Sequence, residues 1–187
     1  MTIPANPVID DASRPRLEAA GAGAVTDMGR ASADALVSVH EHLRQEMRQV
    51  IGVLEQIAAG SLDPAAGRSA VNRMTMRQNY WSVGAFCATY CRIVTLHHTI
   101  EDQRLFRDLR DEDVSLAPVL ERLSEEHEVI ADLLDRLDRA LVEMVDHPGA
   151  VEPARAEAAV LSEALLSHLA YEEEQLIGPL GRSTILL

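Results

Sequence analysis

The sequence predicts an all-α fold, an antiparallel up-down four-helix bundle. Good helix formers (Ala, Leu, Glu and Arg) dominate the composition, and aromatic residues make up only 3% of the chain. Four long stretches carry apolar residues at alternating spacings of three and four, which is typical of a helix with one buried face. Short breaks separate these stretches, so consecutive helices are expected to run antiparallel. No stretch shows the alternation typical of a strand.

The composition also narrows the function. The 187 residues, 47% of them apolar, are enough for one domain with a sizeable core. The net charge of −13 argues against nucleic acid and anionic membranes as partners. The first residues lack the pattern of a signal peptide, and no apolar run reaches the ~18 residues of a membrane span. Cys87 and Cys91 are expected to be reduced thiols, which favours a cytoplasmic location.

Three regions are expected along the chain. Residues 1–30 show no periodicity and are rich in Pro, Gly, Ala and Asp. They are therefore expected to form a partly flexible N-terminal arm, or one draped over the bundle. The bundle is expected to span residues 31–181, and a short apolar C-terminal tail residues 182–187. The sequence leaves the oligomeric state open.

The first helix is expected at about residues 31–59, closed by Gly60-Ser61. Asp63-Pro64 then looks like an N-cap followed by proline at the first helical position, so a helix is expected to restart at residue 64. It would either stop near Thr75 or run on into the next helix. The inner face of the first helix is expected to carry Leu36, His40, Leu43, Met47, Val50, Leu54 and Ile57.

The other helices are expected at about residues 77–110, 116–146 and 152–178. His147-Pro148-Gly149 would stop the third helix, and Gly178-Pro179 the fourth. Their inner faces are expected to carry Val83, Phe86, Tyr90, Ile93, His97, Glu101 and Leu105; Leu120, Leu123, His127, Ile130, Leu134, Leu137, Leu141 and Met144; and Ala158, Leu161, Leu165, His168, Glu172 and Leu176.

Each helix places one histidine on its inner face, and two of these are followed one turn later by a carboxylate on the same face. An ionised glutamate on a buried face is costly unless it is paired or bound to metal. A helix rises ~1.5 Å per residue, which brings the four imidazoles near one level of an antiparallel bundle. The sequence therefore predicts a metal site built from His40, His97, Glu101, His127, His168 and Glu172.

Imidazole and carboxylate ligands suit Fe, Mn, Zn or Cu. Six donors exceed the needs of one metal, whereas two metals bridged by Glu101 and Glu172 would use them all. No histidine follows a glutamate by three residues, so a ferritin-type Glu-x-x-His site is excluded, and H-E-x-x-H is absent too. His98 lies at the edge of its helix face and would be either a fifth histidine ligand or a supporting or surface group.

The remaining polar groups near these positions are expected to support the ligands or to face solvent. Asp102, Glu126 and Glu173 each adjoin a ligand candidate. His42 is expected in solvent, and His147 at a helix end, where a cation complements the helix dipole.

Four motifs in order resemble one known family. They are His40-x-x-Leu43-Arg44, His97-His98-x-x-Glu101-Asp102-x-x-Leu105-Phe106, Glu126-His127-x-x-Ile130 and His168-Leu169-x-x-Glu172-Glu173. Over about residues 33–180 they are similar to the hemerythrin-like (HHE cation-binding) domain. The resemblance implies a four-helix bundle around an oxo- or hydroxo-bridged pair of non-haem iron ions, with Zn or Mn as substitutes. By motif position, the four histidines would be terminal ligands, and Glu101 and Glu172 bridging ligands.

The sequence departs from respiratory hemerythrins at two positions. The second histidine on the third helix is replaced by Ala131, and the last pair is His168-x-x-x-Glu172 rather than His-x-x-x-x-Asp. Five histidines bind only if His98 is a ligand, and the bacterial and iron-sensing members look closer than the oxygen carriers.

Three functions are compatible with the sequence. The first is a diiron protein that binds, senses or disproportionates a small oxidant, namely O₂, peroxide or nitric oxide, and the sequence leaves open whether it is an enzyme. The second is an iron-binding regulatory module without turnover. The third is a metal-free helical interaction domain.

Overall fold

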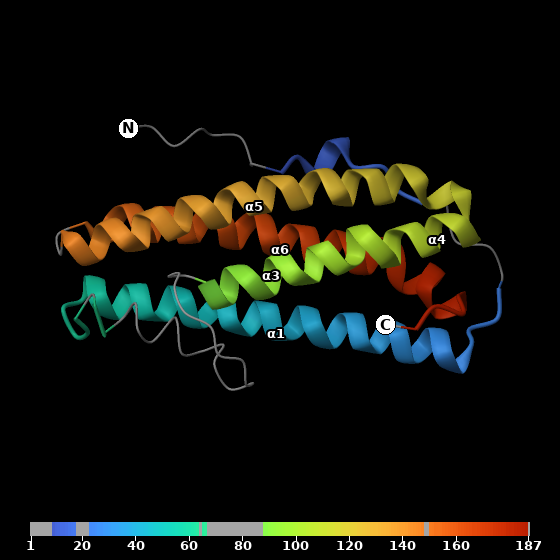
Figure 1. Cartoon of the computed structure of the whole chain (residues 1–187), viewed down its shortest axis with the longest axis horizontal. Coiled ribbons are helices and arrows are strands. Elements are labelled where there is room, and N and C mark those ends of the chain that lie inside the picture. Colours follow the sequence, from blue (N-terminus) through green and yellow to red (C-terminus); the bar gives the residue numbers. More distant parts are fainter. Residues whose placement is uncertain (1–8, 18–22, 64, 67–87, 148–149, 187) are drawn as a thin grey trace. The chain divides into compact units, whose positions relative to one another are not determined.

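The structure is a computed structural model, and it describes residues 9–17, 23–63, 65–66, 88–147 and 150–186. Every element in these ranges is helical (Figure 1). The long helices are α1 (Asp27–Ala58), α5 (Ala117–Asp146) and α6 (Val151–Arg182), together with the consecutive segments α3 (Ala88–Ile100), η2 (Glu101–Leu105) and α4 (Phe106–Glu112). Two short 3₁₀ turns are η1 (Asp11–Ser13) and η3 (Val114–Leu116). The predicted all-α fold with four main helices is confirmed.

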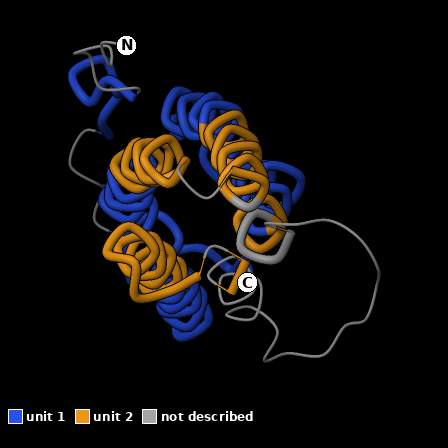
Figure 2. The backbone as a smooth tube through the Cα atoms, turned by 90° about the vertical axis from the view of Figure 1, so that its left-hand side faces the viewer, with its two compact units in different colours: residues 1–42, 97–129, 164–187 blue, residues 43–96, 130–163 orange. Residues whose placement is uncertain are grey.

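The chain divides into two compact units, shown in different colours in Figure 2. Unit 1 comprises residues 1–42, 97–129 and 164–187, and unit 2 comprises residues 43–96 and 130–163. All seven predicted metal ligands belong to unit 1. Within the described residues, no helix has both the length and the apolarity that a membrane crossing requires.

Backbone and side-chain contacts in unit 1 show how its helices run. The Thr26 amide donates to the Gly181 carbonyl at 3.0 Å, which brings the start of α1 to the end of α6. The Thr184 hydroxyl donates to Glu112 at 3.1 Å, which brings the end of α6 to the end of α4. Within this unit, α4 and α6 therefore run in the same direction and α1 runs against them, as an up-down bundle requires.

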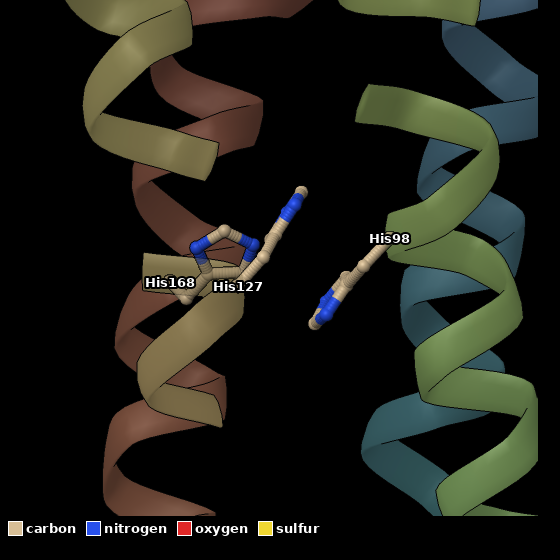
Figure 3. Close-up of side chains that lie close together, drawn as sticks. All are labelled: His98, His127 and His168. Carbon is tan, nitrogen blue, oxygen red and sulfur yellow. The ribbon is translucent and has the colours of Figure 1, made fainter. Parts of the chain in front are cut away.

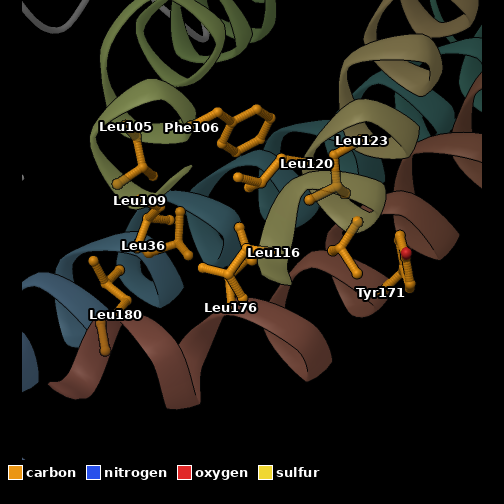
Figure 4. Packing of buried hydrophobic residues seen from close by; sticks show 12 residues of the cluster. Leu36, Leu105, Phe106, Leu109, Leu116, Leu120, Leu123, Tyr171, Leu176 and Leu180 are labelled. Carbon is orange, nitrogen blue, oxygen red and sulfur yellow. The ribbon is translucent and has the colours of Figure 1, made fainter. Parts of the chain in front are cut away.

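The core of unit 1 draws on all four helices (Figure 4). Its members are apolar residues that are nearly inaccessible to solvent, apart from the Tyr171 hydroxyl, which donates to the Pro15 carbonyl at 2.6 Å. The buried cluster consists of Ala33, Leu36, Leu105, Phe106, Leu109, Leu116, Val119, Leu120, Leu123, Tyr171, Leu176 and Leu180. This cluster supports the helix segments that carry the predicted ligands.

Unit 2 is built from the same helical pattern. Met47, Leu54, Ile130, Leu137 and Leu161 are buried there at positions predicted from periodicity. Val53, Val94, Leu133 and Ala154 are buried beside them and were not predicted. Arg155 pairs with Glu55 at 2.8 Å, joining α6 to α1, and Arg136 pairs with Glu157 at 2.8 Å, joining α5 to α6. The predicted inner faces of the first, third and fourth helices are confirmed across both units.

The predicted start of the first helix was wrong by four residues, because α1 begins at Asp27 rather than at residue 31. The hydroxyl oxygen of Thr26 accepts from the Gly29 amide at 2.8 Å, which is the pattern of an N-cap. With Thr26 as the cap, the last residues of the expected arm belong to the helix.

The predicted end of the fourth helix at Gly178-Pro179 was also wrong, because α6 continues to Arg182 with Pro179 inside it. Proline removes one helical hydrogen bond. The last turn persists because Leu176 and Leu180 are fully buried, and because Ser183 and Thr26 donate to the terminal carbonyls of Leu180 and Gly181.

Some predictions fall outside the described residues. The fate of the helix expected to restart at residue 64, and the side chains of Val83, Phe86, Tyr90 and the two cysteines, are among them. The predicted cap itself is present, since Asp63 accepts from the Ala66 amide at 3.0 Å.

Candidate metal centre

The structure brings the seven predicted ligands together inside unit 1. One comes from α1, two from the end of α3, one from the first position of η2, one from α5 and two from α6. Six of them are buried, and the His97 side chain is the most exposed of the seven, at 11%. In this order they are His40, His97, His98, Glu101, His127, His168 and Glu172.

These residues form two groups, in each of which the candidate ligand atoms all lie within 4.8 Å of one another. The three-histidine group consists of His98, His127 and His168, which approach from α3, α5 and α6 (Figure 3). The His98 and His127 rings stack with their centroids 3.9 Å apart. The two-histidine group consists of His40, His97, Glu101 and Glu172. Its two imidazoles bring their Nε2 atoms within 3.1 Å.

Each glutamate contacts both groups. Glu101 places Oε1 at 3.1 Å from Nε2 of His97 and Oε2 at 3.7 Å from Nε2 of His127. Glu172 places Oε2 at 3.4 Å from Nε2 of His40 and at 3.8 Å from Nε2 of His168. Carboxylates that bridge two metals must reach the ligand sets of both, and these two do so.

Three imidazoles have a carboxylate on the side away from the centre. In each pair the Nδ1 atom lies within 3.1 Å of a carboxylate oxygen. For His40 and His168 this contact is a hydrogen bond, which selects the tautomer with hydrogen on Nδ1 and leaves the Nε2 lone pair free. The pairs are His40 with Glu173 at 2.8 Å, His127 with Asp102 at 3.0 Å and His168 with Glu126 at 3.1 Å. The three acidic residues that adjoin ligand candidates in the sequence therefore each contact a different candidate, on another helix.

Most of the buried side-chain nitrogen and oxygen atoms that lack a hydrogen-bond partner in the described residues belong to this centre. They include both oxygens of Glu101 and of Glu172 and the Nε2 atoms of His98, His127 and His168. A buried polar group without a partner costs about 1–3 kcal/mol, and a charged one costs more. The cluster therefore destabilises the fold unless a cation binds its free donor atoms. Imidazole with carboxylate is a donor set that fits Fe, Mn or Zn.

Burial sets the protonation of these groups. Burial lowers the pKa of His97 to about 3 and moves the pKa of His98 well below its ordinary value, so both imidazoles are neutral and able to bind metal at neutral pH. Burial and the nearby Glu172 carboxylate raise the pKa of Glu101. Burial also acts to raise the pKa of Glu172, but its contact with the His40 imidazole outweighs that effect and lowers it.

The η2 segment is a π-helical turn that begins at Glu101. The Phe106 amide donates to the Glu101 carbonyl, five residues back. A π turn accommodates an extra residue, and such turns are frequent at functional sites. Glu101 thereby faces the centre while Asp102 contacts His127, and Leu105 and Phe106 are both buried in the core.

The structure excludes a surface position for His98, while its role as a ligand stays a prediction. It is 5% exposed and lies among the ligand candidates, not at the surface. His42 and His147 are exposed, and His147 pairs with Glu143 at 3.0 Å.

Sequence reasoning missed the π turn, although the adjacent apolar residues Leu105 and Phe106 are a signal for it. It also missed Arg14, whose buried guanidinium binds Glu126, and no periodicity in that segment points to it.

Comparison with known proteins agrees with this geometry. A family model described as Hemerythrin HHE cation binding domain matches residues 33–180, which include all seven candidate ligands. No curated protein and no solved structure matches the chain. The matched region covers most of the chain and a site that can hold metal cations. The chain therefore belongs to the hemerythrin HHE cation-binding domain family.

Proposed function

We propose that this protein binds two iron ions between its four helices and uses them to bind, sense or disproportionate a small oxidant such as O₂, peroxide or nitric oxide. The observation that carries the proposal is the pair of ligand groups, both reached by two buried glutamates whose oxygens lack hydrogen-bond partners among the described residues. A metal-free interaction domain would leave these groups unsatisfied. Zn or Mn would fit the same donors.

The donors are shared unequally between the two positions. The three-histidine group offers three imidazoles and the two-histidine group offers two, while Glu101 and Glu172 reach both. The free coordination position would therefore lie on the metal beside His40 and His97. His97 is also the most exposed of the seven ligands, at 11% of its side chain, which supports access of a small molecule from that side. Iron supplies the redox chemistry when bound.

The protein's own residues hold the donors in place. Glu173 and Glu126 orient the imidazoles of His40 and His168 through their Nδ1 atoms, so that the Nε2 atoms face the centre. Asp102 lies 3.0 Å from Nδ1 of His127. The close approach of apolar residues, such as Phe106 at 5.6 Å from the His127 ring, limits water around the site. A cytoplasmic setting is part of the proposal, because the sequence leads us to expect reduced thiols at Cys87 and Cys91.

Metal analysis and an optical spectrum of protein grown with iron test the proposal. About two irons per chain are expected, with near-ultraviolet absorption from an iron pair. Substitution of both His97 and Glu101 by alanine should abolish binding, because it removes donors from the two-histidine group and one bridging carboxylate. The matched control is His42→Ala on the exposed side of α1, which should keep full iron. Wild-type protein without stoichiometric metal would refute the proposal.

Assays of the loaded protein then separate the functions. Conversion of hydrogen peroxide to oxygen and water would identify an enzyme, and spectral changes that reverse when O₂ or nitric oxide is removed would identify a carrier or sensor. Iron binding that stabilises the fold, without response to any of the three, would instead identify an iron-binding regulatory module.

A further inference from the structure

The segment of residues 9–17 lies before the region that matches the family, yet it belongs to unit 1 and is fixed along α6. The Leu17 amide donates to Gln175 Oε1 at 2.8 Å, and the Pro15 carbonyl accepts from Tyr171 at 2.6 Å. These contacts hold the part of the segment that follows Arg14.

Arg14 inserts its side chain from this segment into the unit, where it is only 2% exposed. Its Nε and Nη2 atoms donate to the two oxygens of Glu126 at 2.8 and 2.7 Å, and its Nη1 donates to Ser167 at 2.9 Å. The guanidinium also lies 4.5 Å from the centre of the Tyr171 ring. A buried guanidinium is costly unless its partners match its planar fork, and here they do.

Glu126 connects Arg14 to the metal centre. The oxygen that accepts from Nη2 of Arg14 also lies 3.1 Å from Nδ1 of His168, and the Nε2 atom of the same ring belongs to the three-histidine group. The other oxygen of Glu126 accepts from Arg122 at 2.9 Å. Arg14 is therefore two contacts away from a candidate metal ligand.

Glu126 differs from the other two carboxylates that contact the ligands. The Glu173 and Asp102 side chains are 21% and 36% exposed, so water can solvate them, whereas Glu126 is 2% exposed. The orientation of its carboxylate therefore depends on protein donors, and Arg14 is the donor that contacts both oxygens.

We propose that residues 9–17 are part of the metal centre and that Arg14 is a positioning residue, which fixes Glu126 and through it the ring of His168. This inference rests on the proposed function, because it requires metal at the three-histidine group. The two parallel hydrogen bonds fix the plane of the carboxylate, and that plane fixes the imidazole whose Nε2 must point at the metal. A lysine at this position would supply the positive charge but not the two parallel hydrogen bonds that the planar guanidinium donates.

Iron release from the full-length protein tests the inference. Wild type, Arg14→Gln, Arg14→Lys and the control Arg16→Gln are loaded with ferrous iron without oxygen, and its transfer to a chromogenic chelator is followed. Arg16 lies in the same segment but is 45% exposed and pairs with Glu174. We expect one iron to leave Arg14→Gln about 10-fold faster, the loss typical of a group that supports a ligand. Arg14→Lys should fall between Arg14→Gln and wild type, and Arg16→Gln should match wild type.

A merely structural role is separated by two measurements. Urea unfolding of the metal-free variants measures how much Arg14 contributes to the free energy of unfolding. The increase in the rate of iron release must be larger than this loss of stability would cause. Adding Arg14→Gln to Glu126→Gln should accelerate release no further, because both act through the same contact.

Wild-type release rates in both Arg14 variants, or equal acceleration in Arg16→Gln, would overturn the inference and leave the proposed function standing. Wild-type protein that binds no iron would overturn both. If Arg14→Gln fails to fold, Arg14→Lys decides: faster release supports the inference, and wild-type release overturns it.

Discussion

Replacement of His98 by leucine should change the stability of the protein in opposite directions without and with metal. His98 is buried, and its Nε2 atom has no hydrogen-bond partner in the described part of the chain, which costs about 1–3 kcal/mol. Stacking of the His98 ring on the His127 ring, with centroids 3.9 Å apart, stabilises the fold by about 0.5–1.5 kcal/mol and offsets part of this cost. Leucine fills a similar volume without a polar atom, so the metal-free variant should be more stable by about 0–2 kcal/mol.

With metal, the same substitution should be destabilising. It reduces the three-histidine group to two imidazoles. If affinity at that position falls about 100-fold, about 2.7 kcal/mol of metal-dependent stabilisation disappears. The metal content should fall towards one ion per chain, because the two-histidine group keeps its donors.

Urea unfolding followed by circular dichroism measures both effects, with each protein in chelator and in ferrous iron. His42→Leu, at an exposed position of α1, is the control and should keep the metal-dependent gain. A His98→Leu variant that loses more than about 2 kcal/mol in chelator would refute the claim that the unpaired nitrogen is costly. One that keeps the full gain from iron would refute the role of His98 as a ligand.

Three further predictions concern the fold around the site. Burial raises the pKa of Glu126, but its imidazole and guanidinium partners lower it more strongly, to about 2; its stabilisation is therefore present above the ordinary value of 4.5 and is lost as pH falls towards the folded value. Metal-free Glu126→Gln should thus lose less stability than wild type, in urea unfolding, between about pH 6 and about pH 3. Leu123→Ala, at a fully buried core position, should cost about 2–5 kcal/mol in the same assay, whereas Val114→Ala, at a highly exposed position, should stay within about 0.5 kcal/mol. Gly29→Ala should lower the thermal midpoint, because a Cβ there would overlap backbone oxygens at the end of α6 and cost about 1–3 kcal/mol, whereas Gly52→Ala, with open space around it, should raise the midpoint. An unchanged midpoint in Gly29→Ala would contradict the close approach of α1 and α6.

Much of the fold was predictable because helix periodicity is a local property. Leu36, Leu123 and Leu161 were placed on inner faces by spacing alone, and each is buried. The candidate ligands followed from the same pattern, since a histidine at an inner position of each helix has few places to point other than the common core. The assignment of His98 did not follow, because the edge of a helix face is compatible with either a buried or a solvated side chain.

Helix ends were less predictable, because tertiary contacts compete with local preferences there. Gly178-Pro179 is a strong local stop, yet burial of Leu176 and Leu180 carries α6 onward to Arg182. The π turn at Glu101 is a similar case. It loses regular helical hydrogen bonds, and it persists where the packing of Leu105 and Phe106 and the contact of Asp102 with His127 favour it.

By itself, the sequence determined that this chain forms four amphipathic helices and that their inner faces carry imidazoles and carboxylates at a common level. Only the tertiary structure decided how these donors divide into two groups, that Glu101 and Glu172 reach both, and that Arg14, from a segment without periodicity, binds the carboxylate that contacts His168. The physical reason is the distance along the chain over which each kind of interaction acts. Periodicity reports which side of a helix is buried, whereas contacts such as that between Arg14 and Glu126 join residues that are 112 positions apart in the chain.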